Sequence, residues 1–128
     1  MRWLKVLLAI NGIAFLFYAV SNTVAPSSFF LASDAPGYAV DMLRVLSLAY
    51  LAMGLIQLGT WFVSDRLAVQ MVAIGSLVFE VGFGVLAATQ GTASSDPFHQ
   101  MGLGIAAGNA VVAALYAWLL YRTRASAA

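Results

Sequence analysis

The sequence contains no cysteine and a single histidine, His99, so several kinds of chemistry are excluded at the outset. Disulfide bonds and thiolate metal sites require cysteine. A metal site built on paired histidines needs a second imidazole, and a serine nucleophile needs a histidine base in a recognisable setting, which His99 lacks. No glycine-rich loop is suited to cradle a phosphate. We therefore expect neither an enzyme nor a resident cofactor or metal.

Charge is also scarce: charged residues make up only 9% of the 128 residues, whereas hydrophobic residues make up 62%. So small a polar fraction cannot cover the surface of a water-soluble domain of this length. The formal net charge of +1 is too small to indicate a nucleic-acid partner. The composition is typical of a protein whose solvent is lipid, and the length predicts a single transmembrane domain. Membrane lipids are therefore the first expected partner.

Four apolar runs are long enough to cross a hydrocarbon core of about 30 Å, which requires ~20 residues of helix. They cover approximately residues 3–24, 38–63, 67–89 and 98–121. Prolines, glycines and charged residues separate them. The runs lack the alternation of barrel strands, and lipid admits only helices or closed barrels. The expected fold class is therefore all-α, an integral membrane four-helix bundle.

Basic residues predict the orientation of this bundle, because the cytoplasmic ends of membrane helices are rich in lysine and arginine. Arg44 alone falls near one expected side, and five basic residues fall on the other: Arg2, Lys5, Arg66, Arg122 and Arg124. Both termini are therefore predicted to be cytoplasmic. Aromatic residues near the same boundary would form an interfacial belt: Trp3, Trp61, Trp118 and Tyr121.

Glu80 is the most informative residue, because it lies midway along the run 67–89 and is the only charge in that run. A carboxylate at the centre of a membrane span is costly unless it is neutralised, paired or facing water. Such acids are by default candidates for ligand or ion binding. The alternative is a structural carboxyl that holds helices together. The sequence leaves both interpretations open.

The run that carries Glu80 has one face of small or polar residues, which should face protein because small residues let membrane helices approach closely. This face consists of Ala73, Ser76, Glu80, Gly84 and Ala87. The fourth run offers a matching surface in Gly102, Ala106, Asn109 and Ala113. At ~1.5 Å per residue, Glu80 lies about 14 Å below Thr89 and Asn109 about 16 Å below Phe98. The two polar residues therefore share a level.

The first run contributes further polar residues. Asn11 lies close to mid-membrane, and Tyr18 and Asn22 continue its face toward the outside at helical spacing. This face predicts a polar path from the outer surface. Asn11 and Asn109 have an alternative role, because asparagine often forms hydrogen bonds between membrane helices.

Arg44 is the remaining member of the predicted site. It lies about 9 Å below the Tyr38 end of the second run, so its side chain could extend downward to Glu80. Alternatively, Arg44 pairs with Asp41 at the interface and extends outward. The predicted ligand-binding residues are therefore Glu80, Arg44, Asn109, Asn11 and Tyr18.

Parts of the first half of the chain resemble a known group. The segments are Lys5-Val-Leu-Leu-Ala-Ile-Asn11-Gly12, Ala25-Pro26 and Gly37-Tyr-Ala-Val-Asp41-Met-Leu-Arg44. They are similar to DoxX-like proteins, small bacterial four-helix membrane proteins of unknown function. The resemblance implies a compact multi-pass bundle in the bacterial inner membrane, sometimes linked to redox partners or quinone metabolism. Arg44 matches an arginine of that group, whereas Glu80 lies outside the resemblance, and no catalytic residue is implied.

The features together predict a non-enzymatic inner-membrane protein. It would hold an apolar or amphipathic ligand, lipid or quinone-like, or a partner subunit around the polar patch. The alternative is a small transporter or channel in which Glu80 couples to protons or cations; four spans are too thin to enclose a wide pathway alone, so a dimer would be expected. Gly104 and Gly108 have the spacing of a close-packing motif, which predicts either packing within the monomer or the seam of a homodimer.

Overall fold

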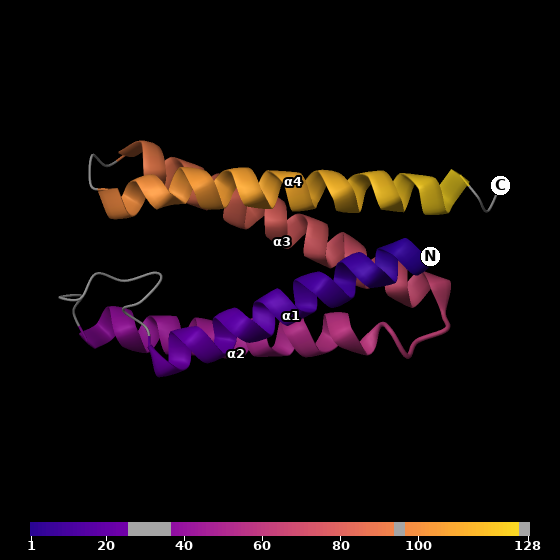
Figure 1. Cartoon of the computed structure of the whole chain (residues 1–128), viewed down its shortest axis with the longest axis horizontal. Helices are drawn as coiled ribbons and strands as arrows, with labels where there is room; N and C mark the ends of the chain where they lie inside the picture. The colour runs from indigo at the N-terminus through magenta and orange to yellow at the C-terminus, as the bar shows by residue number, and fades with distance from the viewer. Residues whose placement is uncertain (26–36, 94–96, 126–128) are drawn as a thin grey trace. The chain divides into compact units, whose positions relative to one another are not determined.

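The computed structural model of the chain describes residues 1–25, 37–93 and 97–125. Within these segments the backbone forms helices and no strand (Figure 1): α1 (Arg2–Val24), α2 (Gly37–Gly59), α3 (Arg66–Ala93) and α4 (Pro97–Ala125). Each of the four helices is long and apolar enough to cross a membrane. The predicted all-α class with four helices is therefore confirmed.

The end of α2 differs from the prediction, because the helix stops at Gly59 and not at residue 63. Beyond this glycine the backbone tightens, and the amide of Trp61 donates to the carbonyl of Leu58 at 3.0 Å. Hydrogen bonds of this spacing belong to 3₁₀ turns, which commonly terminate helices. Residues 60–63 include apolar side chains as the helix does, so hydropathy alone could not place this end.

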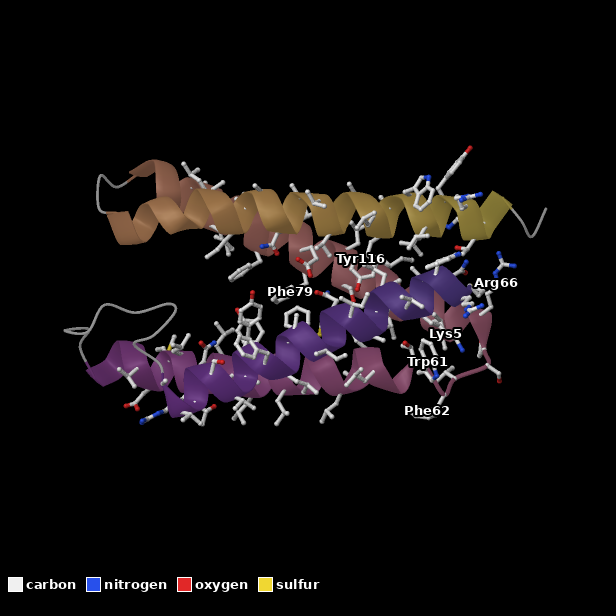
Figure 2. All side chains as sticks on the ribbon, viewed as in Figure 1. Lys5, Trp61, Phe62, Arg66, Phe79 and Tyr116 are labelled. Carbon is white, nitrogen blue, oxygen red and sulfur yellow. The ribbon has the colours of Figure 1, made fainter. Side chains whose placement is uncertain are left out.

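Lys5 closes the turn that follows α2. Its Nζ donates to the carbonyl oxygen of Val63 at 2.6 Å and lies 3.4 Å from that of Trp61. Trp61 and Val63 lie beyond the end of α2, so Lys5 satisfies carbonyl groups of the turn and not of the helix. Lys5 and Trp61 are labelled in Figure 2. The contact joins the first turns of α1 to the end of α2.

The helices group into two compact units. One unit is Lys5–Ser64, which contains α1 and α2; the other comprises Met1–Leu4 and Asp65–Ala128, which contain α3 and α4. In each unit the two main helices run antiparallel (Figure 1). That all 128 residues form one domain stays a prediction.

In the α1–α2 unit, the helices approach most closely where Gly12 meets Gly54. A Cβ atom at Gly54 would lie 2.9 Å from the carbonyl oxygen of Gly12 and 2.9 Å from Cγ of Leu16. Only glycine leaves room for two backbones at this separation. Further along the same contact, the rings of Phe15 and Tyr50 stack with centroids 5.5 Å apart. These contacts hold the two helices as a pair.

In the α3–α4 unit, the face of small and polar residues is buried, as predicted. Its buried members are Ala73, Ser76, Glu80 and Ala87. A Cβ atom at Gly84 would lie 3.2 Å from Cβ of Asn109, and Nε2 of Gln70 donates to Oγ1 of Thr123 at 3.3 Å. Gln70 and Gly84 are as far apart along α3 as Asn109 and Thr123 are along α4. The two contacts therefore fix one antiparallel register.

Candidate functional site

Glu80 lies in the middle of α3 and is only 5% exposed. Ser76, one turn earlier on the same face, is fully buried, and its Oγ donates to the carbonyl of Val72 at 2.9 Å. Ser76 and Glu80 are thus two buried polar groups one turn apart on the same face of α3.

The register of the α3–α4 pair identifies a residue that the sequence reasoning missed. It places Ala113 of α4 opposite Glu80 and Tyr116 one turn nearer to Thr123. Tyr116 is among the largest fully buried side chains and projects from α4 (Figure 2). A signal was present in the sequence, since Gly102, Ala106, Asn109 and Ala113 alternate in spacings of four and three, and the next step of three reaches Tyr116. A buried phenol and a buried carboxyl thus occupy adjoining levels.

Asn109 does not direct its amide as predicted. Its Nδ2 donates at 2.7 Å to the carbonyl of Ile105, one turn earlier on its own helix. The sequence placed Asn109 at the level of Glu80, as a ligand-binding residue or as one that forms a hydrogen bond between helices. The side chain contributes to the helix contact in another way, through its Cβ against Gly84. Ser76, Glu80 and Tyr116 are buried near the middle of the α3–α4 unit and are called its polar core below.

The α1–α2 unit holds a second set of polar groups. Asn11 is half-buried next to Gly12, and the ring of Tyr18 lies 6.3 Å from that of Tyr50. Asn22 is only 1% exposed, and neither its Nδ2 nor its Oδ1 has a hydrogen-bond partner. A buried amide without partners lowers stability. The face predicted from Asn11, Tyr18 and Asn22 is therefore partly buried rather than open along its length.

Arg44 forms the ion pair that was one of its two predicted roles. Its Nη1 lies 3.4 Å from Oδ1 of Asp41, three residues earlier on α2, and both side chains are largely exposed. An exposed pair at this spacing stabilises a helix by only about 0.5 kcal/mol or less. Arg44 belongs to the α1–α2 unit and Glu80 to the α3–α4 unit. Their pairing stays a prediction.

The polar core can form hydrogen bonds of both kinds. A neutral carboxyl or a phenol donates to a carbonyl oxygen, and a carboxylate accepts from a hydroxyl or a cation. Among the side chains that the structure describes, no three histidine, aspartate or glutamate residues gather as metal ligands would.

Comparisons with protein-family models, with curated proteins and with solved structures find no significant match. The resemblance to DoxX-like proteins therefore stays a prediction. The coarser description is secure: the described part of the chain forms four apolar helices, each able by length and composition to cross a membrane.

Proposed function

We propose that the protein is a non-enzymatic multi-pass protein of the bacterial inner membrane that holds an apolar or amphipathic ligand at Glu80. The observation that supports the proposal is a buried carboxyl at mid-helix, with Ser76 and Tyr116 on the faces that pack α3 against α4. A charged acid at the centre of a membrane helix costs about 2.5 to 3.5 kcal/mol on insertion scales. An acid at such a position is by default a candidate for ligand or ion binding.

The ligand chemistry follows from the groups at the site. A quinone-like carbonyl accepts a hydrogen bond from a neutral carboxyl or from the phenol of Tyr116, and a lipid hydroxyl donates to the oxygen of Glu80. The rest of such a molecule is apolar and suits the surroundings. A partner subunit would use the same groups by presenting one polar side chain from an apolar helix.

Replacing Glu80 by leucine should remove the ligand without unfolding the protein. A hydrogen bond between neutral groups contributes about 0.5 to 1.5 kcal/mol and one to a charged group about 1.5 to 3 kcal/mol. At about 1.4 kcal/mol per factor of ten, the loss of ligand should be about twofold to tenfold for a neutral carboxyl and tenfold or greater for a carboxylate. The apolar replacement is tolerated because buried ionisable groups often exchange for apolar ones at little cost. Mass spectrometry of quinones and lipids per mole of purified protein measures the loss, and thermal melts measure stability.

Thr89→Val is the matched control, because Thr89 lies on the same helix and its Oγ1 donates to the carbonyl of Leu86 at 2.8 Å. The control should retain the ligand. Equal ligand content in all three proteins, with a lower melting temperature only for Glu80→Leu, would show that the carboxyl is structural. Proton-driven uptake in liposomes that Glu80→Leu abolishes would instead establish the alternative, a coupled transporter.

The proposed orientation places both termini in the cytoplasm, because five of the six basic residues fall at one side. Gly37 begins α2 and Ser64 precedes α3, and both are exposed. In intact cells, an impermeant thiol reagent should label Gly37→Cys and leave Ser64→Cys unlabelled. After the cells are broken, both should react. The reverse pattern in intact cells would place the termini outside.

A further inference from the structure

Three arginines lie at one end of the α3–α4 unit. The hydrogen bond from Gln70 to Thr123 brings the first turns of α3 beside the last turn of α4. Arg66 begins α3, and Arg122 and Arg124 lie in the last turn of α4. The negative end of a helix dipole amounts to only about half an elementary charge. This end of the unit therefore remains strongly positive.

The acid that adjoins Arg66 in the chain does not neutralise this charge by an ion pair. Oδ1 of Asp65 accepts hydrogen bonds from the amides of Leu67 at 2.7 Å and Ala68 at 3.2 Å, so it caps α3. Among the described residues, the structure shows an ion pair between Arg44 and Asp41, and both residues belong to the other unit. The guanidinium groups at this end are therefore available to an anion.

Arg122 is held in place by an aromatic ring. Its guanidinium carbon lies 5.1 Å from the ring centroid of Trp118, which is within the range of a cation–π contact. Stacking on a ring leaves the N–H edge of the guanidinium open, and this edge matches the oxygens of a phosphate. Trp118 itself is 53% exposed. Tryptophan at a helix end is typical of the headgroup level of a bilayer.

An exposed stripe extends along α4 from Arg122, and its other members are apolar. The members recur at spacings of three and four and lie on the side turned away from α3: Gly104, Gly108, Val111, Leu115, Trp118 and Arg122. A Cβ atom at Gly104 or Gly108 would have no neighbour within 4 Å. The glycine pair is therefore not part of the contact between α3 and α4, where we had considered packing within the monomer.

The stripe has the depth of one membrane leaflet. Trp118 lies about 15 Å from Gly108 at ~1.5 Å per residue, and one leaflet is half of a hydrocarbon core of about 30 Å. From the helix end inward, the stripe presents a cation, an amphipathic ring and then aliphatic or small residues. A phospholipid has the same order of phosphate, glycerol backbone and acyl chain.

We propose that Arg122 binds the phosphate of an anionic phospholipid whose acyl chain lies along the exposed stripe of α4. Net negative charge on the lipid is favoured because Arg66, Arg122 and Arg124 together make a positive potential at this end, and each basic residue near a membrane surface adds to the attraction. The proposal rests on the membrane location proposed above and is independent of the ligand at Glu80.

Titration of the purified full-length protein with phosphatidylglycerol or phosphatidylcholine, followed by native mass spectrometry, tests the phosphate contact. The wild type should bind phosphatidylglycerol at least about tenfold more tightly than phosphatidylcholine. Arg122→Gln should weaken the binding of phosphatidylglycerol about tenfold. Arg124→Gln makes the same charge change on another side of the helix and should weaken it less than about threefold. Equal losses in both variants would overturn the proposal, because they would indicate unspecific attraction.

Two further arms identify what occupies the stripe. Gly108→Leu leaves the charge unchanged, and a Cβ atom there meets no neighbour, so the fold should tolerate it. The leucine side chain should occupy the space of the acyl chain and weaken phosphatidylglycerol binding at least about threefold. Inorganic phosphate, added at the same concentration as the lipid, should not displace phosphatidylglycerol. The Glu80→Leu variant should bind phosphatidylglycerol as tightly as the wild type does. Displacement of the lipid by inorganic phosphate would contradict the proposal. So would a dimer that forms without lipid and that Gly108→Leu converts to a monomer.

Discussion

Replacing Gly54 by valine should lower the free energy of unfolding by about 1 to 3 kcal/mol, the usual cost of forcing atoms into a packed contact. The new Cβ atom would lie 2.9 Å from the carbonyl oxygen of Gly12. The side chain of Leu16, equally close, can rotate away, but a backbone oxygen cannot. Removing a glycine from a helix recovers less than about 1 kcal/mol. The clash therefore determines the sign, and the α1–α2 pair should separate.

Gly82→Val is the control for this prediction, because a Cβ atom at Gly82 would have no neighbour within 4 Å. It makes the same chemical change in the interior of α3 and should be neutral or slightly stabilising. Thermal unfolding of both variants in the same detergent, followed by circular dichroism, compares them. Similar melting temperatures for the two variants would mean that Gly12 and Gly54 do not form the contact in solution.

Truncating Tyr116 to alanine should have the largest effect on stability, about 3 to 5 kcal/mol, because the side chain is fully buried and its removal leaves a cavity. Tyr121→Ala removes the same atoms five residues further along α4, where the side chain is 73% exposed. The control should change stability by about 0.5 kcal/mol or less. Equal effects would show that α4 does not pack against α3 through the face of Tyr116.

Tyr116→Phe separates the hydroxyl from the ring and tests whether the phenol and the carboxyl of Glu80 form one site. We expect the stability effects of Tyr116→Phe and Glu80→Leu to be non-additive, with a coupling of about 0.5 kcal/mol or more. Four thermal melts complete the double-mutant cycle. Effects that add within about 0.3 kcal/mol would place the two groups in separate environments.

The helices were predictable because lipid restricts the backbone to few structures, and an apolar run of sufficient length has one solution. The end of α2 was not predictable, because Trp61 and Phe62, which follow the helix, are as apolar as the helix itself. What distinguishes the two segments is backbone geometry, in which the amide of Trp61 bonds the carbonyl of Leu58. The hydropathy of these residues does not indicate which of the two backbone geometries they adopt.

The site was predictable in part. Spacings of three and four placed Ser76 and Glu80 on one buried face, and the structure confirms this burial. Tyr116 was missed only because the matching face on α4 was not followed past Ala113. The direction of the Asn109 amide is a different kind of failure. A side chain that can bond its own helix or a neighbour chooses by rotamer, and residue spacing carries no information on rotamers.

Several polar side chains bond the carbonyl one turn earlier on their own helix: Thr23 to Ala19, Ser47 to Leu43, Ser76 to Val72 and Asn109 to Ile105. These hydrogen bonds within one helix are relevant to the biosynthesis of the protein. In the membrane location proposed above, each hydroxyl or amide that already bonds its own helix leaves one fewer polar group to satisfy when a nascent helix enters lipid before its neighbour has been made. Insertion and pairing are then separate events. Substitutions at Gly12 or Gly54 would spare insertion and leave inserted helices without a partner.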